Sequence, residues 1–361
     1  MVAPKLAETL GLAGLRPPGT LTIAITGACN LSCSHCWVGA GEFSSARHVP
    51  SRTLRRLLGE FATLGGKGVR LTGGEPLCHP DWLDLLRFAV STGFSSVALQ
   101  TNGMLLDDDS VAGLRRLDFP GLGIQISFDG ATAKTHDLVR GAGAFDSLLQ
   151  GVRRLVRAGL GPRTCVFFTE MRHNLVEIPE LLELAEQLGV ASVATGTLVP
   201  CGRAAEDSLV AAPEPAQYLR LLERYHADPE FRRRYEMLGK VAALEWRCGD
   251  APRGEGCTFV ENPYLTAEGR LYPCVLCHAD PYSVTGVFDK SLEDALGEGA
   301  PLWSGLLQAS RCRSEAIVKC RTCSERLTCA GGCLGRAWAS FGDVLAADDR
   351  CELRRAVRSG R

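Results

Sequence analysis

Three cysteines near the start of the chain have a spacing suited to metal chemistry. Cys29, Cys33 and Cys36 lie in the run Cys-Asn-Leu-Ser-Cys-Ser-His-Cys, directly after the apolar stretch 21–26. That stretch has the composition of a strand, so we expect the cysteines on the loop that follows it. Such a loop can direct three thiolates to one point, and thiolates are the ligands of iron–sulfur clusters. Three ligands for a four-iron cube leave one iron able to bind another molecule.

Strand-like and helix-like segments alternate over the first two-thirds of the chain. Apolar runs typical of strands are separated by amphipathic stretches with helical spacing. Such repeats predict a parallel sheet with right-handed crossovers, and they place chemistry at the C-terminal ends of the strands. The predicted strands are 20–26, 69–72, 96–101, 121–128, 164–169 and 192–197, and the predicted helices are 52–64, 82–92, 108–117, 145–158 and 178–188.

Composition narrows the class of protein. The chain has 361 residues, 45% of them hydrophobic and 22% charged, with a formal net charge of −1. A nucleic-acid binder would usually carry a strong basic excess. No apolar run reaches the length of a membrane span, and the N-terminus lacks the pattern of an export signal. We therefore expect a cytoplasmic enzyme with no nucleic-acid or membrane partner.

The cysteines are numerous and unevenly distributed. Only six of the sixteen fall in the first 201 residues, and ten lie between Cys248 and Cys351. Without an export signal a reducing compartment is expected, so metal ligation explains the cysteines better than disulfides do. The change in cysteine density predicts a domain boundary. We expect an N-terminal extension at 1–19, a barrel at 20–230, a linker at 231–256 and a cysteine-rich domain at 257–361.

Further motifs follow the predicted strands. Gly73, Gly74, Glu75 and Pro76 come directly after the second strand, where two glycines allow a ligand to approach the backbone closely. The third strand ends in Thr-Asn-Gly with Asn102 at its centre. The fourth ends in Ser-Phe-Asp-Gly, which begins at Ser127, and His136, Asp137 and Arg140 follow it. For His136 and Asp137 we favour a structural role at a helix N-terminus.

Together these motifs resemble those of the radical S-adenosylmethionine (radical SAM) enzymes, especially members that modify peptides and proteins. The resemblance implies a partial (β/α)6 TIM barrel in the α/β class. It also implies that the open iron chelates the amino and carboxylate groups of SAM. By the same resemblance the Gly-Gly-Glu-Pro run holds the SAM amino group, Ser127 contacts the ribose or carboxylate, Arg140 pairs with the carboxylate, and Asn102 supports the site. Arg203, in a Pro-x-Gly-Arg-Ala turn after the sixth strand, is expected at the barrel mouth.

The C-terminal cysteines resemble a SPASM domain, which holds two auxiliary four-iron clusters. A predicted hairpin, with 264–265 and 271–272 as its strands, brings Cys257 and Cys274 together. The family's ligation then assigns Cys257, Cys274 and Cys333 to the first auxiliary cluster. The second cluster takes Cys320, Cys323, Cys329 and Cys351.

The fourth ligand of the first auxiliary cluster is left open by the motif. We predict Cys248, because the glycine- and proline-rich segment between it and Cys257 can fold back on itself. Cys277 and Cys312 are the competing thiols. A cluster that stays open and binds substrate directly is the remaining alternative.

The resemblance implies that SAM is cleaved to methionine and a 5′-deoxyadenosyl radical, which abstracts a hydrogen atom from the substrate. Three 4Fe–4S clusters and SAM are the expected cofactors, and a low-potential donor such as flavodoxin or ferredoxin is the expected electron source. The auxiliary clusters suit an oxidative outcome, so we predict crosslinking or other maturation of a ribosomally made peptide or protein. Only about 20 residues precede the first strand, so a separate leader-binding protein is a candidate partner.

Other functions stay open at this point. Sulfatase-maturing relatives have an Asp directly after the hairpin cysteine, but this chain has Val275, which argues against that activity. Modification of a small molecule, such as a haem precursor or an aminoglycoside-like sugar, is the closest alternative. A radical epimerase would need a hydrogen-donating thiol, for which Cys201, Cys277 and Cys312 are candidates. A non-catalytic electron-transfer or zinc protein would leave the Gly-Gly-Glu-Pro run without a role.

Overall fold

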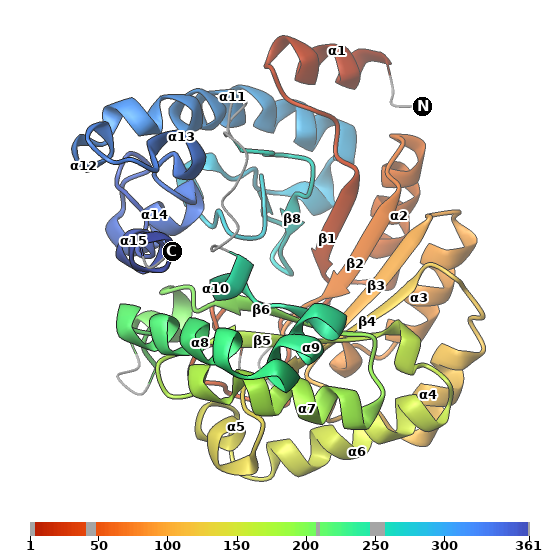
Figure 1. The fold of residues 1–361 in the computed structure, drawn as a ribbon. Coiled ribbons are helices and arrows are strands. Elements are labelled where there is room, and N and C mark those ends of the chain that lie inside the picture. Colours follow the sequence, from red (N-terminus) through yellow and green to blue (C-terminus); the bar gives the residue numbers. More distant parts are fainter. Residues whose placement is uncertain (1–3, 41–47, 207–209, 246–256, 360–361) are drawn as a thin grey trace. The chain divides into compact units, whose positions relative to one another are not determined.

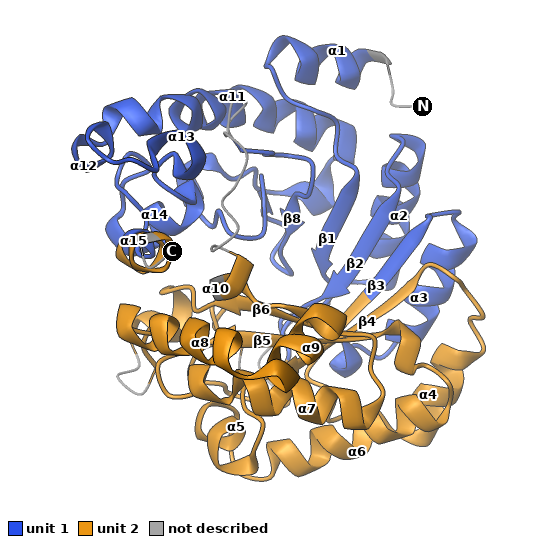
Figure 2. Ribbon diagram, in the orientation of Figure 1, with its two compact units in different colours: residues 1–28, 44–98, 250–351 blue, residues 29–43, 99–249, 352–361 orange. Residues whose placement is uncertain are grey.

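The chain forms two compact units, each assembled from separate segments (Figure 2). The computed structural model describes residues 4–40, 48–206, 210–245 and 257–359. Unit 1 comprises residues 1–28, 44–98 and 250–351, and unit 2 comprises 29–43, 99–249 and 352–361. The three-cysteine loop therefore belongs to unit 2, and the C-terminal cysteines belong to unit 1. The four consecutive domains expected from the sequence stay a prediction, because these units follow packing rather than chain order.

The predicted alternation of strands and helices is confirmed (Figure 1). Each predicted strand and helix occurs, with its ends within two residues of the expected positions, because buried apolar periodicity marks both. The strands are β1 (Thr20–Ala24), β2 (Gly68–Thr72), β3 (Ser96–Thr101), β4 (Leu122–Phe128), β5 (Thr164–Glu170), β6 (Ser192–Thr197), β7 (Gly239–Lys240), β8 (Tyr264–Leu265) and β9 (Leu271–Tyr272).

The helices include several that the sequence did not predict, at the N-terminus, directly after β4 and beyond β6. They are α1 (Pro4–Leu12), α2 (Ser51–Thr63), α3 (Trp82–Ser91), α4 (Asp108–Arg115), α5 (Ala133–Arg140), α6 (Ala144–Arg157), α7 (Ile178–Leu188), α8 (Pro215–Ala227), α9 (Pro229–Leu238), α10 (Ala242–Glu245), α11 (Leu292–Ala316), α12 (Val318–Arg321), α13 (Arg326–Cys329), α14 (Leu334–Phe341) and α15 (Cys351–Ser359). Among the described residues, no helix is both long enough and apolar enough to cross a membrane.

In unit 1 the first strand joins distant parts of the chain. β1 pairs in parallel with β2, and on its other edge it pairs in parallel with β8, with Thr22 opposite Tyr264. β8 and β9 form the predicted antiparallel hairpin, in which Tyr264 faces Tyr272. β1 is almost wholly buried, as expected for a parallel strand with neighbours on both sides. The C-terminal cysteine-rich segment is thereby attached to the first strand.

Unit 2 has its own parallel strands and covering helices. β4, β5, β6 and β7 pair in parallel, in chain order. Buried and half-buried residues alternate along β4, so one face of this strand lies in the core. Helix α6 buries an apolar stripe that includes Phe145, Leu148 and Val152. Helix α7 packs on β6 and on α9.

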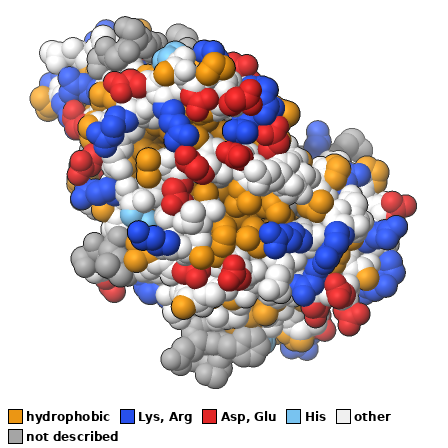
Figure 3. Space-filling model, turned by 60° about the horizontal axis from the view of Figure 1, so that its bottom comes forward, with side chains coloured by type: hydrophobic (Ala, Val, Ile, Leu, Met, Phe, Trp, Pro, Cys, Tyr) orange, Lys and Arg blue, Asp and Glu red, His pale blue; other side chains and the backbone are white. Residues whose placement is uncertain are grey.

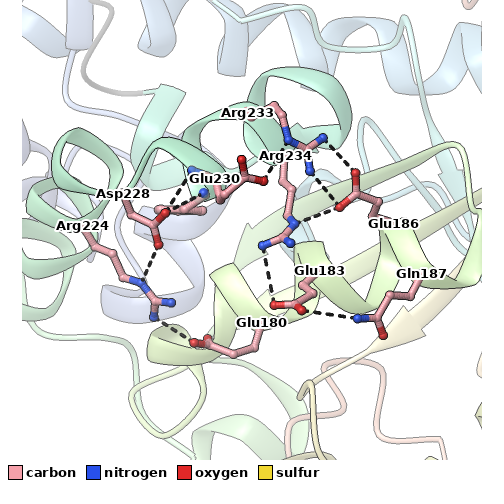
Figure 4. Close-up of polar contacts among 10 residues, drawn as sticks. Glu180, Glu183, Glu186, Gln187, Arg224, Asp228, Glu230, Arg233 and Arg234 are labelled. Atoms are coloured by element: carbon pink, nitrogen blue, oxygen red, sulfur yellow. Dashed lines mark hydrogen bonds and ion pairs between the residues drawn. The ribbon is translucent and has the colours of Figure 1, made fainter.

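Charged side chains connect the outer helices of unit 2 (Figure 4). Glu186 of α7 accepts hydrogen bonds from Arg233 and Arg234 of α9, at 3.0 and 2.9 Å. Arg224 of α8 pairs with Glu180 at 2.9 Å. These groups are half-buried or exposed at the protein surface, so each pair contributes little on its own. On the face in Figure 3, basic and acidic side chains are interspersed around hydrophobic ones, in keeping with the near-zero net charge.

Close packing of α6 gives a test of the fold. A Cβ on Gly151 would lie 2.3 Å from the carbonyl oxygen of Gly103, which ends the Thr-Asn-Gly run. We expect Gly151→Ala to lower the free energy of unfolding by about 1–3 kcal/mol, because the helix must shift away from that carbonyl. Gly59→Ala in α2 is the matched control, since nothing lies within 4 Å of its Cβ position. It should be neutral or stabilise by up to about 1 kcal/mol in urea titrations.

Candidate active site and cysteine clusters

The backbone of the three-cysteine loop is held by the turn after β6. The Nε of Arg203 donates to the carbonyl of Cys33 at 2.9 Å, and the Arg203 amide donates to the carbonyl of Cys36 at 3.0 Å. Gly202 has a φ of +57°, and a Cβ there would lie 2.6 Å from the Cys36 oxygen. Only glycine fits this close approach. Arg203, expected at the barrel mouth, thus holds the loop that carries the thiols.

A buried carboxylate organises the same loop from the other side. Asp129, fully buried after β4, accepts a hydrogen bond from the Nε of Arg140 at 2.5 Å. The Nε2 of His35, between Cys33 and Cys36 in the chain, lies 3.1 Å from the same carboxylate. Burial alone would raise the pKa of Asp129, but the charges of Arg140 and His35 outweigh it and hold that pKa well below its usual range. Asp129 is therefore an anion that pairs with the Arg140 cation and contacts the His35 ring.

Arg140 and the residues after Asp129 have structural partners in this arrangement. The partner of Arg140 in the structure is Asp129, a contact that the sequence did not predict, and its pairing with the SAM carboxylate stays a prediction. Asp137 accepts from the amides of Gly143 and Phe145, both at 2.8 Å, and so caps the start of α6. The structural role expected for Asp137 is confirmed, but the N-cap position is wrong, because His136 and Asp137 both lie inside α5, whose N-cap is Thr132.

Buried polar atoms around the three thiols fit a bound group. Cys29 and Cys33 are buried, and Cys36 is half-buried. Among the described residues, the Nδ1 of His35, the Oγ of Ser34 and one terminal nitrogen of Arg203 are buried with no hydrogen-bond partner. Burial raises the pKa of the Cys33 thiol, whereas a metal-bound thiol is deprotonated. A thiolate-bound cluster whose sulfides accept hydrogen bonds suits these residues.

Asn102 and Ser127 belong to the same unit as the loop. Asn102 is buried, and its Nδ2 donates to the Oδ1 of Asn30, directly after Cys29, at 2.8 Å. This contact agrees with the supporting role that the sequence predicts for Asn102. Ser127 lies near the end of β4 and is half-buried. Its contact with SAM stays a prediction.

The Gly-Gly-Glu-Pro run packs in unit 1 against the segment just ahead of Cys29. The amides of Gly74 and Glu75 donate to the carbonyls of Thr26 and Ala28, at 2.8 and 2.7 Å. A Cβ on Gly73 would lie 2.4 Å from the Thr26 oxygen, and one on Gly74 would lie 2.3 Å from the Ala28 oxygen. Both glycines are thus required for close approach. Glu75 is buried and accepts from the Leu77 amide at 3.1 Å, where a short 3-10 helix (Pro76–Cys78) begins.

The hairpin of unit 1 collects the first group of C-terminal thiols. Burial first, and then three neighbouring thiols, raise the pKa of Cys274 well above its usual value. These thiols belong to Cys277, Cys333 and Cys257. The three cysteines assigned to the first auxiliary cluster are therefore close together, and Cys277 joins them. The predicted fourth ligand, Cys248, lies outside the described residues.

A second group of thiols lies in the last part of unit 1, between residues 320 and 351. Burial and then three other thiols raise the pKa of Cys320. The neighbours are Cys351, Cys329 and Cys323, and together with Cys320 they make up the four-cysteine set predicted from the sequence. Cys320 also packs in a buried cluster with Ile317 and Ala347, against which Cys351 lies.

Two buried charged residues near the C-terminal thiols of unit 1 were not predicted from the sequence. Arg313 of α11 is 1% exposed and donates to the carbonyls of Gly331 and Ala346, at 2.7 and 2.8 Å. Asp348 is also buried, and it accepts from the amide of Cys333 at 2.8 Å. Burial lowers the pKa of Arg313, while Asp348 and nearby thiols raise it. Neither residue lies in a recognisable motif, so only packing reveals them.

The state of the cysteines agrees with metal ligation. Every cysteine within the described ranges is a free thiol. In the same ranges, no three His, Cys, Asp or Glu side chains form a group that could hold one metal ion. That finding concerns a site for a single metal ion. It does not exclude a four-iron cluster, because the thiolates of such a cluster bind different irons and lie farther apart.

Comparisons with known proteins place the chain in a family. Residues 23–185 match the Radical SAM superfamily. The mycofactocin maturase MftC of Mycobacterium tuberculosis is 31% identical over 356 residues, which cover 96% of this chain and 86% of the relative. The chain belongs to the radical SAM superfamily. It is a radical SAM enzyme with a C-terminal region of the SPASM type, and its cofactors include a 4Fe–4S cluster and SAM.

Two further relatives are informative about this radical SAM enzyme. An AdoMet-dependent heme synthase of Methanosarcina barkeri is 29% identical over 355 residues, covering 93% of this chain and 97% of the relative. The structure of Streptococcus suis SuiB bound to its precursor peptide SuiA has a similar fold, with a TM-score of 0.74 and 18% identity. That match covers 97% of this chain and 79% of SuiB. The predicted radical SAM fold is confirmed.

The Asp129 network predicts a large penalty for loss of its charge. Asp129→Asn keeps the side chain's shape but leaves Arg140 as a buried cation without its partner anion. We expect the free energy of unfolding in anaerobic urea titrations to fall by about 3–5 kcal/mol. Asp84→Asn is the control, because Asp84 pairs with Arg87 on the surface, and it should cost under about 1 kcal/mol. Equal losses in the two variants would contradict a buried ionic network.

His136 predicts a pH dependence of stability. Its Nδ1 accepts from the Asp129 amide at 3.1 Å, and burial, followed by the charge of Arg140, lowers its pKa to about 4. Below about pH 6.5 the unfolded chain binds a proton that the folded chain does not, so stability falls as pH decreases from there. We expect the unfolding free energy to drop between pH 7 and 5.5 (about one unit below the free histidine pKa). The drop should be smaller in the His136→Asn variant than in the unmodified protein. An equal drop in both would show that His136 does not cause the pH dependence.

Proposed function

We propose that this radical SAM enzyme oxidises a ribosomally made peptide or protein, forming a crosslink or a related modification, with three 4Fe–4S clusters. The observation that carries the proposal is the arrangement of thiols in three sets. Cys29, Cys33 and Cys36 would hold an open-cornered cluster. The two groups of unit 1 would hold the auxiliary clusters, with Cys257, Cys274 and Cys333 in the first and Cys320, Cys323, Cys329 and Cys351 in the second.

SAM would bind at the open corner of the first cluster. Glu75 and the half-buried backbone of Gly73 and Gly74 would suit a cationic amino group, because a carboxylate and nearby carbonyls attract it. Ser127 is suited to hydrogen-bond the ribose or carboxylate. Arg140 would add a cation for the carboxylate while its Nε stays on Asp129. When bound, the cluster supplies the electron that cleaves SAM to methionine and a 5′-deoxyadenosyl radical, which takes a hydrogen atom from the substrate.

An oxidative outcome requires the substrate to lose two hydrogen atoms in total. One leaves as the hydrogen atom taken by the radical, and the other leaves as an electron and a proton when the new bond forms. The thiols of unit 1 would hold the groups that accept this electron, and Arg313 lies near thiols of both sets. A low-potential donor such as flavodoxin or ferredoxin would supply the electron for SAM cleavage.

The comparisons favour a peptide substrate. MftC is a maturase, and SuiB, which shares the fold, binds a precursor peptide. A separate leader-binding protein is a further proposed partner. The second candidate function is modification of a haem precursor, which the similarity to the heme synthase over nearly its whole length supports.

The three-cluster arrangement has a direct test. Anaerobically reconstituted protein should contain about twelve irons, and replacing Cys29, Cys33 and Cys36 together by Ala should leave about eight. The same variant should lose SAM cleavage, measured as formation of 5′-deoxyadenosine. A fall to two-thirds of the iron with SAM cleavage intact would exclude the three-cysteine loop as the SAM-binding site.

The substrate class is tested by comparing two substrates under the same reducing conditions. With a precursor peptide encoded beside the enzyme, we expect faster 5′-deoxyadenosine formation and a peptide product that has lost two hydrogen atoms in mass spectra. The triple-alanine variant is the control and should give no product. Turnover of an iron porphyrin carrying propionates, with no change in any peptide, would favour the haem-precursor function instead.

A further inference from the structure

Cys277 lies beside the hairpin that carries Cys274. Its amide donates to the carbonyl of Cys274 at 3.2 Å, so the chain turns back directly after the hairpin cysteine. The Cys277 side chain is fully buried. The turn keeps Cys277 close to Cys274.

The residue after Cys277 fixes this turn. The ring of His278 is stacked between Tyr264 and Tyr272, with centroid separations of 5.0 and 4.8 Å and interplanar angles of 13° and 4°. These tyrosines face each other across β8 and β9. Because both strands of the hairpin hold the His278 ring, the neighbouring Cys277 backbone has little freedom to move.

The segment that carries Cys333 packs on the same turn. A Cβ on Gly335 would lie 2.3 Å from the carbonyl oxygen of Leu276 and 2.9 Å from the Cα of Cys277. Cys333, at the N-cap of α14, is only two residues ahead of Gly335. Glycine at 335 thus lets the start of α14 approach the 276–277 backbone closely.

The electrostatic surroundings of Cys277 agree with this placement. The thiols of Cys333 and Cys257 lie close enough to Cys277 to interact with it electrostatically. The thiol of Cys274 is also within electrostatic reach of Cys277. Each of the three cysteines assigned to the first auxiliary cluster therefore has Cys277 as a neighbour. Cys312, the other competing thiol, is exposed.

We infer that Cys277 is the fourth ligand of the first auxiliary cluster, in place of Cys248. This inference rests on the proposed function, because it assumes a cluster on Cys257, Cys274 and Cys333. A cluster with four thiolates has no iron free to bind the substrate directly, so its role is electron transfer. A metal-bound thiolate also has no hydrogen to return to a substrate radical, so Cys277 would not serve an epimerase as hydrogen donor.

The test uses the Cys29, Cys33 and Cys36 triple-alanine variant, in which only the auxiliary clusters remain. Cyanide binds an iron that lacks a protein ligand, and the electron paramagnetic resonance spectrum reports this binding. We expect cyanide to leave the spectrum of the triple variant unchanged. Adding Cys277→Ala should open one iron and produce a cyanide-dependent signal, or reduce the iron content from about eight to about four.

Matched substitutions separate the candidate thiols. Cys248→Ala, Cys312→Ala and Cys165→Ala in the same background should keep the parent spectrum and iron content, and Cys165 is the control outside every proposed cluster. Cys277→Ser keeps the size of the side chain, and its oxygen ligand should shift the spectrum of one cluster without loss of iron. This second variant keeps the test decisive if Cys277→Ala does not fold.

Two results would overturn the inference. One is a cyanide signal already present in the triple variant and unchanged by Cys277→Ala, which would mean an open cluster. The other is a signal that appears with Cys248→Ala but with neither Cys277 variant. Failure of the proposed function looks different, because the triple variant itself would then hold about four irons or fewer.

Discussion

In each unit, several cysteine thiols are brought close together in surroundings that largely exclude water. The rest of the structure has to hold these thiols in place. Away from water, thiolates repel each other, and burial raises the pKa of Cys33, Cys274 and Cys320. Bound iron, being positively charged, would reverse this effect and keep the thiols deprotonated. The surrounding structure must therefore hold the backbone that carries each cysteine before iron binds. Arg203, Gly202 and the β8–β9 hairpin do this through backbone contacts rather than through the sulfur atoms.

In both units, buried charged residues lie beside these thiols. In unit 2, Asp129 is an anion between Arg140 and His35, and the Cys33 thiol adds to the stabilisation of the Arg140 cation. In unit 1, Arg313 is buried near thiols of both groups, and Asp348 binds the amide of Cys333. Buried charges are costly unless they are paired, so their presence here points to a function beyond stability. Charges near a cluster also shift its reduction potential.

The inferred ligand sets assign different tasks to the clusters. A loop with three cysteines leaves one iron for SAM, whereas four thiolates around each auxiliary cluster leave none for the substrate. Substrate selection would then depend on the side chains that line the barrel, not on the cysteines. The chain is similar over most of its length to relatives named as a mycofactocin maturase and a heme synthase. The cysteines of this chain would determine the transfer of hydrogen atoms and electrons, and the choice of substrate would depend on other residues.

The sequence by itself determined the strands, the helices between them and the motifs on the loops. Those features depend on local periodicity, and the hairpin that joins Cys257 to Cys274 depends on a turn only a few residues long. Tertiary structure decided which distant residues meet. Arg203 reaches the carbonyl of Cys33 from 170 positions away in the chain, and Cys277 meets Cys333 only because Gly335 allows α14 to approach. No local pattern marks such contacts, because they form only when separate elements pack together.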